Sequence, residues 1–348
     1  MTLTETIETT SPFTGRRERR RRETAVTVVL LALTATLFIA TMMIGSYWLK
    51  PWEVVASLLG IAGDPSVDFI VRDLRLPLAA SGLAVGLALG TAGIVFQKLL
   101  ANPLASPDFV GISQGAGVAA VLSIILLHLG AVAVSFAALG GALVAGALIY
   151  ALAWRGGITG YRFILIGIGV SEFCVALTGY VLARAELFDA REAMTWLVGS
   201  IGQTGALQLR ILLGALIVLL PTAVVLGRWL SVLELGDDAA SALGVRVEVA
   251  RVSLLAVAIV LVALATAAAG PVSFVALISG PIAIRIVRTG GPVLLPSALI
   301  GASLVLGADL IGSHLLPVTL PTGVITGAVG APYLIWLLAT VNREGRGG

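Results

Sequence analysis

The stretch VSLLAVAIVLVALATAAAGPVSFVALISGPIAI, residues 252–284, contains no Asp, Glu, Lys or Arg. About 20 apolar residues are enough for one helix to cross the hydrocarbon core of a bilayer, so this stretch is too long for a single crossing. Its Gly-Pro pair at 270–271 predicts a break between two crossings. Backbone groups in lipid must be paired within helices or closed barrels, and the stretch lacks the alternating polarity of barrel strands. Two membrane helices are therefore predicted here.

The rest of the chain has the same character. Of its 348 residues, 58% are hydrophobic and only 12% are charged, which is more apolar surface than one soluble core can bury. The first apolar run is too long for a signal-peptide core and no small-residue cleavage site follows it, so we expect a retained anchor. Division at charges, Pro/Gly pairs and polar turns predicts an all-α integral membrane protein with about ten transmembrane helices, at residues 25–49, 76–98, 111–129, 132–154, 163–184, 209–228, 251–269, 272–288, 293–313 and 322–340.

Basic residues predict how these helices are oriented. The motif RRERRRR at residues 16–22 precedes the first helix, and positive charge beside a membrane helix favours the cytoplasmic side. Ten crossings then put both termini in the cytoplasm, and 16 of the 22 Lys and Arg residues fall on that side. We expect a basic cytoplasmic tail over 1–24, a membrane domain over 25–340 and a cytoplasmic tail over 341–348, in a multi-pass protein of the cell membrane. The net charge of +3 reflects the anchor cluster, so no nucleic-acid partner is expected.

Residue types exclude several chemistries. Cys174 is the only cysteine, and His128 and His314 are the only histidines, so no Cys/His metal cluster is predicted. Neither lysine follows a glycine, so the chain has no phosphate-binding loop of the G-x-x-x-x-G-K type, and any ATP must be used by a partner. GISQG at 111–115 matches the serine-hydrolase pattern G-x-S-x-G, but it lacks the strand-turn-helix context. A hydrolase built on Ser113 is therefore only a distant rival to a transport protein.

Two carboxylates lie deep within predicted membrane helices. Glu172 and Asp309 are functional candidates, because stranding a carboxylate in lipid is costly. An ion-coupled secondary transporter would use them as a proton relay. The sequence offers no set of basic partners for them, so this interpretation stays an alternative.

Small residues predict where one helix packs. Gly82, Gly86 and Gly90 recur at four-residue spacing and so share one helix face. Membrane helices associate through close backbone approach at such small residues. We expect the helix over 76–98 to lie near the centre of the bundle.

A short acidic segment separates two apolar runs. In GDDAASALGV, residues 236–245, Asp237 and Asp238 stand in the first turn of a predicted helix and Gly244 stands at its C-terminal cap. The helix has about two turns and cannot cross a bilayer, and two acids facing an anionic leaflet argue against a membrane-surface role. We expect it to dock into a groove on another protein through a small apolar face made of Leu235, Ala239, Ala242 and Leu243.

The chain resembles the permease subunits of FecCD-type ABC importers over roughly residues 70–340. Its most specific motifs are NPLASP at 102–107 and GAPYLIWLL at 330–338. Further matching stretches are RDLRLPLAASGLAVGLALGTAGIVFQKLL at 72–100, LGDDAASALGV at 235–245, GPVSFVALISGPIAIRIV at 270–287 and LLPSALIGASLVLGADLIG at 294–312.

The resemblance implies a BtuC-like type II permease fold with ten helices. It implies an ATP-driven importer for a ferric siderophore that works by alternating access, with haem or cobalamin as alternative cargo. The implied partners are a second permease subunit, two cytoplasmic ATPases that bind ATP and Mg²⁺, an extracytoplasmic binding protein and the lipid bilayer. No cofactor or metal is expected on this chain.

The resemblance also assigns roles to particular residues. The segment at about 235–244, including Gly236, is similar to the coupling helix that docks into the ATPase. A cytoplasmic gate is implied for two loop segments, and docking of the binding protein for one basic motif. The matching gate residues are Asn102, Leu104, Thr159 and Gly160, and the matching docking residues are Arg75, assisted by Arg72.

The chain departs from the family pattern at two places. Leu78 occupies the second arginine position of the family's R-L-P-R motif. Ser313 and His314 stand where many relatives carry an arginine. We therefore favour a heterodimer whose other permease supplies the missing charges, with a homodimer as the alternative.

Overall fold

A computed structural model describes residues 12–45, 47–61, 63–154, 160–288 and 293–344, and throughout these ranges the secondary structure is helical, without strands. The prediction of an all-α membrane fold is confirmed. Ten helices overlap the ten predicted crossings, namely α1 (Pro12–Met43), α4 (Leu76–Leu99), α6 (Ile112–Ile125), α7 (Ala131–Ala153), α8 (Gly160–Leu182), α10 (Ala206–Leu233), α12 (Val247–Ala269), α13 (Val275–Val287), α14 (Leu294–Leu310) and α15 (Thr322–Glu344).

Helix length divides the ten into two kinds. Within the described residues, seven helices are long and apolar enough to cross a membrane, whereas α6, α13 and the apolar part of α15 are shorter. At 1.5 Å per residue, the 14 residues of α6 reach about 20 Å, which is less than a hydrocarbon core of about 30 Å. The predicted crossings at 111–129 and 272–288 therefore extend beyond the helices α6 and α13 that the structure shows. Residues in the left-handed region, Gly111 and Phe274, precede α6 and α13 and break each helix there.

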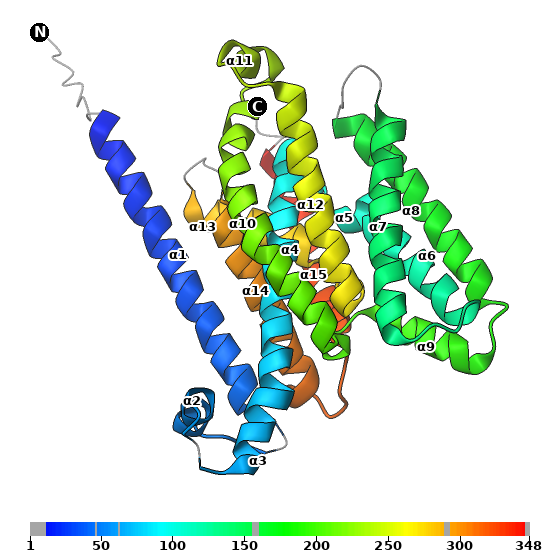
Figure 1. Cartoon of the computed structure of the whole chain (residues 1–348). Coiled ribbons are helices and arrows are strands. Elements are labelled where there is room, and N and C mark those ends of the chain that lie inside the picture. The colour runs from blue at the N-terminus through cyan, green and yellow to red at the C-terminus, as the bar shows by residue number, and fades with distance from the viewer. Residues whose placement is uncertain (1–11, 46, 62, 155–159, 289–292, 345–348) are drawn as a thin grey trace, which may run out of the picture.

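Most of the smaller elements lie at the two ends of the bundle, whereas α5 lies inside it (Figure 1). Figure 1 shows α11 at one end and α2, α3 and α9 at the other, which we name the α11 end and the α9 end. The small elements are α2 (Pro51–Leu59), α3 (Pro65–Asp68), the π-helical η1 (Phe69–Arg75), α5 (Pro107–Val110), α9 (Leu187–Val198), η2 (Ile201–Gln203), α11 (Asp237–Ala242) and η3 (Ile311–Leu315).

The helix α4 forms the centre of one group of helices and packs on α10, α12, α13 and α14. A second group, α6 to α9, lies beside the first and contacts it mainly through α7 and α12 (Figure 1). The helix α1 packs on α14 at the far edge. It begins at Pro12, so the helix runs through the arginine cluster that the sequence suggested as part of a tail.

Glycines let α4 approach its neighbours backbone to backbone. Gly82, Gly86 and Gly90 all face α14. A Cβ atom at Gly86 would lie 2.3 Å from the Cα of Ala302. The hydroxyl of Ser297 donates to the Gly90 carbonyl at 2.6 Å, which adds a hydrogen bond between the two helices.

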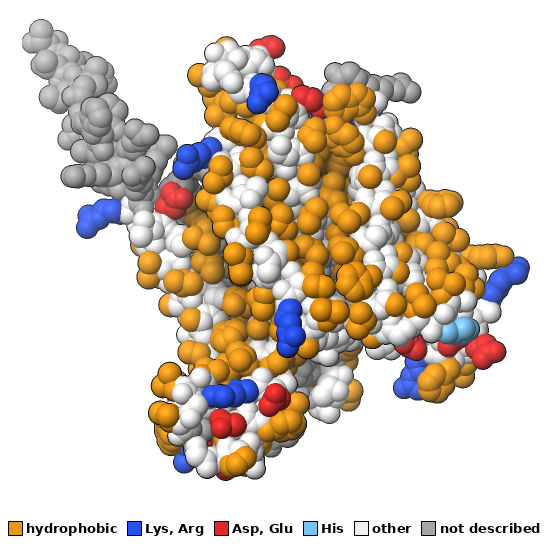
Figure 2. Space-filling view, viewed as in Figure 1, with side chains coloured by type: hydrophobic (Ala, Val, Ile, Leu, Met, Phe, Trp, Pro, Cys, Tyr) orange, Lys and Arg blue, Asp and Glu red, His pale blue; other side chains and the backbone are white. Residues whose placement is uncertain are grey.

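Hydrophobic and charged side chains occupy different zones of the protein surface. Figure 2 shows hydrophobic side chains over the middle of the visible face, with most charged side chains near the two ends. This arrangement matches a bilayer, whose core excludes charge while its interfaces accept it.

Replacement of Gly86 by Ala should destabilise the bundle. The added methyl group has no space at the Ala302 backbone, and overpacking of this kind costs about 1–3 kcal/mol. A lower midpoint of thermal unfolding in detergent would report the loss. Gly214→Ala on α10 is the matched control, since nothing lies within 4 Å of a Cβ there. Equal midpoints for the two variants would contradict this account of the packing.

Candidate functional site

The helix α11 projects from the turn between α10 and α12. Gly236 (φ 95°) before it and Gly244 (φ 82°) after it adopt left-handed conformations that favour glycine. Between them, Ala240 is fully buried and anchors the helix. Leu235 and Leu243 flank the helix and are 64% and 65% exposed. Their exposure leaves an apolar surface at the α11 end that is open for contact with another molecule.

The two acids of α11 differ in their surroundings. Arg251 of α12 donates to both carboxylate oxygens of Asp237, at 2.7 and 3.0 Å. Bidentate pairs of this kind fix orientation as well as adding energy. Asp238 is exposed. Asp237 therefore holds α11 against α12, a contact that its position in the sequence did not reveal. Ala242 is exposed and Ala239 is half-buried, so both predicted apolar positions are partly or fully accessible.

A cleft of about 610 Å³ joins α11 to the loop between α4 and α5, residues 100–106. We call this segment the α4–α5 loop. Lys98 at the end of α4 forms an ion pair with Glu234 at the end of α10, across the cleft. Asn102 lines the cleft together with Asp237 and Arg251. The structure thus brings the α4–α5 loop next to the root of α11.

The α4–α5 loop is a compact turn. The Asn102 side chain accepts a hydrogen bond from the Leu104 amide at 2.9 Å, which is the Asx-turn geometry that favours asparagine. A Cβ at Gly160 would lie 2.7 Å from the Leu100 carbonyl, so the start of α8 packs directly on the loop. Gly160 thus packs on the same loop that holds Asn102 and Leu104, and the gate role of these residues stays a prediction. Thr159 lies outside the described residues.

A half-buried carboxylate follows the α4–α5 loop, and sequence reasoning missed it. Asp108 accepts hydrogen bonds from the hydroxyl of Ser113 at 2.9 Å and from the backbone N–H of Phe274. Phe274 has φ 67°, a conformation that costs a bulky residue free energy and persists only where its surroundings enforce it. Asp108 thus links the α4–α5 loop to the break before α13.

Ser113 has an acid beside it but lacks the geometry of a hydrolase nucleophile. Its hydroxyl is committed to Asp108 in the first turn of α6. A serine hydrolase needs a histidine beside its serine, but His128 follows the last turn of α6, roughly 20 Å from Ser113. In the described ranges no three His, Cys, Asp or Glu side chains converge as metal ligands.

The arginines predicted for docking lie near the α9 end, and one of them is internal. Arg75 is 9% exposed, and its guanidinium donates to the carbonyls of Met42, Met43 and Tyr47. It therefore caps the C-terminus of α1, which corrects the expectation that it offers a surface contact. Arg72 is more exposed and donates to the Ser57 carbonyl.

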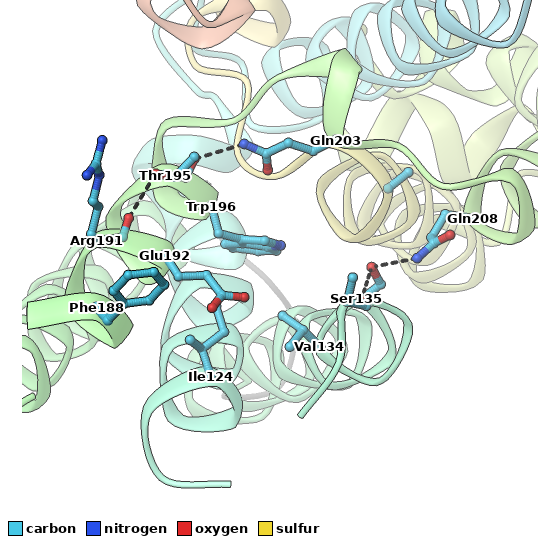
Figure 3. Close-up of a pocket in the computed structure, with 12 residues that line it drawn as sticks. Ile124, Val134, Ser135, Phe188, Arg191, Glu192, Thr195, Trp196, Gln203 and Gln208 are labelled. Atoms are coloured by element: carbon cyan, nitrogen blue, oxygen red, sulfur yellow. Dashed lines mark hydrogen bonds between the residues drawn. The ribbon is translucent and has the colours of Figure 1, made fainter. Parts of the chain in front are cut away.

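A cavity of about 550 Å³ lies at the α9 end between α9 and the helices α6, α7 and α10. In Figure 3, Glu192 and Trp196 project into it, while Arg191 extends away. Gln203 donates to the Thr195 carbonyl at 3.0 Å, and Gln208 donates to Ser135 at 3.2 Å. The lining residues come from several helices, so no local motif could have identified it.

The two membrane carboxylates lie in different parts of the bundle. Asp309 on α14 is 4% exposed and accepts a hydrogen bond from Thr322 at 3.3 Å. Glu172 on α8 is exposed. The helix α8 packs on α5, α6 and α7, whereas α14 packs on α1, α4 and α13. Nothing in this packing of the described helices brings the two carboxylates together as a relay.

The sequence is similar to those of known transport permeases. The model of the FecCD transport family matches residues 32–340. The ferric enterobactin transport system permease protein of Escherichia coli is 38% identical, with 90% of this chain and 98% of that protein covered. The achromobactin transport system permease protein of Dickeya dadantii is 39% identical, with 93% and 94% covered.

Similarity extends to a vitamin B12 permease and to a solved structure. The vitamin B12 import system permease protein of Serratia proteamaculans is 35% identical, with 93% of this chain and 96% of that protein covered. A solved metal-chelate type ABC transporter in an inward-facing conformation has the same fold, with a TM-score of 0.78 at 23% identity and with 91% and 99% of the two chains covered.

Loss of the Asp237–Arg251 pair should loosen α11. Asp237→Asn and Arg251→Gln should each cost about 0.5–1 kcal/mol and speed amide hydrogen exchange in α11 roughly two- to fivefold. The charge swap Asp237→Arg with Arg251→Asp should restore part of the protection. Exchange that stays at the wild-type rate in both single variants would show that the pair does not position the helix.

Proposed function

The chain belongs to the FecCD transport family, and from this premise we propose that it is the permease subunit of an ATP-driven importer for a ferric siderophore. A transport permease is not an enzyme, so ATP and Mg²⁺ belong to separate ATPase subunits in this proposal. The chain itself uses no cofactor. The observation that carries the proposal is α11, whose exposed Leu235 and Leu243 stand beside a clamp between Asp237 and Arg251.

In this proposal the α11 end faces the cytoplasm and α11 docks into an ATPase. Movement of the ATPase then displaces α11 with the ends of α10 and α12. The Lys98–Glu234 ion pair connects this region to α4 and the α4–α5 loop. The loop and Gly160 thereby form the cytoplasmic gate, which opens and closes by alternating access.

The cargo assignment is supported by the relatives. Those named for ferric enterobactin and achromobactin are 38% and 39% identical to this chain. Relatives named for vitamin B12 or cobalamin are 35% identical, so cobalamin is the second candidate. Haem stays a third cargo of the same importer class.

The proposed assembly also contains a second permease and an extracytoplasmic binding protein at the α9 end. Leu78, Ser313 and His314 depart from the family's basic positions, so we favour a heterodimer over a homodimer. Arg75 is committed to the end of α1, so in this proposal the more exposed Arg72, which contacts the Ser57 carbonyl and Asp68, is the docking arginine.

Charging the exposed face of α11 should release the ATPase. Leu235→Asp combined with Leu243→Asp puts two carboxylates into an apolar contact, and loss of such anchors costs about 2 kcal/mol or more. ATPase co-purified in mild detergent and ATP-dependent iron uptake should both fall at least about tenfold. The matched control is Leu187→Asp on α9, which is 87% exposed at the opposite end and should leave ATPase binding unchanged.

Two outcomes would contradict the proposal. An ATPase that still co-purifies with the double variant would rule out docking through this face. Iron uptake that survives loss of the ATPase and collapses with the proton gradient would instead support a secondary transporter.

A further inference from the structure

Glu172 is a carboxylate in the middle of a membrane helix. It is the thirteenth of the 23 residues of α8, which places it about 18 Å from the start of the helix. Its side chain is exposed, beside Phe173, which is 68% exposed. Within the described residues the Glu172 side chain makes no hydrogen bond or ion pair. The described part of the chain therefore neither covers nor neutralises this carboxylate.

The opposite face of α8 fixes the level of Glu172 in the bundle. Gly167 and Ser171 are buried there against α5 and Gly111. A Cβ at Gly111 would lie 3.0 Å from the Ser171 amide nitrogen. Glu172 therefore stands next to the level at which the α4–α5 loop and α5 lead into α6.

Exposed residues follow one face of α8 over several turns. Ile168 and Ala176 lie one turn on either side of Glu172 and are exposed, and we call this face the α8 stripe. Nothing lies within 4 Å of a Cβ at Gly169 or Gly179. The helix makes its main contacts with α5, α6 and α7, on its other side. These contacts leave the α8 stripe on the side of the helix where a second permease can face it.

A carboxylate at this depth is costly in lipid and is found where a membrane protein encloses water. We propose that Glu172 lines the water-filled cargo route of the importer and makes that route prefer neutral or cationic ferric chelates to polyanionic ones. This rests on the proposed function, and it narrows the class of cargo.

Simple charge chemistry connects the residue to the cargo. Iron(III) bound by three catecholates is a trianion, whereas iron(III) bound by three hydroxamates is neutral. A carboxylate in the route repels the trianion and leaves the neutral chelate unaffected. The preferred cargo class is therefore a hydroxamate-type or otherwise uncharged or cationic iron chelate.

Thiol labelling in membranes tests both parts of the proposal. Cys174, the only cysteine, is first replaced by Ala, and single reporters Ile168→Cys and Ala176→Cys are then introduced. Each is treated with a cationic and with an anionic membrane-impermeant methanethiosulfonate reagent of similar size. Both reporters should react, and the cationic reagent should be faster by about three- to tenfold at low salt. Glu172→Gln should remove most of that difference, while Glu186→Gln at the α9 end should not.

The results separate the alternatives. Ile217→Cys on α10, which is 75% exposed, is the control for a lipid-facing position and should react with neither reagent. If neither α8 reporter reacts, α8 does not line a water-filled route. If both react but Glu172→Gln leaves the ratio unchanged, the carboxylate does not set the charge preference. Labelling needs no ATPase, so failure of the importer proposal would be seen separately, in the uptake experiment with α11.

Uptake in cells provides the matching functional measurement. Uptake of a ferric triscatecholate and of a ferric trishydroxamate is compared between Glu172→Gln and wild type. The preference of the binding protein cancels in this ratio. Glu172→Gln should raise uptake of the trianion relative to the neutral chelate by about threefold or more. An unchanged ratio would overturn the cargo preference.

Discussion

The direct contact between the backbones of α4 and its neighbours is the constraint on which the bundle depends. Lipid offers no hydrophobic driving force between helices, so close packing must supply the attraction. Where glycines of α4 face α14 and α13, the next helix fills the space that a side chain would occupy. At Gly93, a Cβ would lie 1.9 Å from the Ala276 carbonyl oxygen. The packing of α4 on α13 and α14 therefore depends on glycines, which have no side chain.

The breaks before α6 and α13 determine where the α4–α5 loop and Asp108 lie. Gly111 and Phe274 interrupt the chain before α6 and α13, and the carboxylate of Asp108 reaches from one break to the other. The edge-to-face contact of Phe109 with Phe274, with centroids 6.3 Å apart, lies beside it. The α4–α5 loop is thus held at both ends, by α8 packing at Gly160 and by Asp108. A loop fixed in this way can transmit a displacement instead of absorbing it.

The sequence predicts the crossings well, because a long apolar run without charge is rarely compatible with anything but a membrane helix. It predicts the small helix at α11 for a local reason, since Asp237, Asp238 and Gly244 mark its two ends. It does not predict the break at Phe274, because phenylalanine carries no signal for a left-handed backbone conformation. The crossing predicted at 272–288 is too long for that reason.

Roles that depend on partners distant in sequence were also beyond prediction. The motif containing Arg75 suggested a surface contact, but the residue reaches the end of α1, some thirty positions earlier in the chain. Asp237 pairs with Arg251 one helix later. The hydrogen bonds of Asp108 come from Ser113 and from the distant Phe274. Residue type gives the chemistry of each group, and only the fold chooses its partner.

The glycine contacts of α4 have a mechanical consequence. Helices joined through their backbones cannot slide or rotate past one another without collision, so α4, α13 and α14 move as one rigid block. The helix α8 packs chiefly on α5, α6 and α7 and lies outside this block. Any change of shape within the subunit must therefore take place outside the block of α4, α13 and α14.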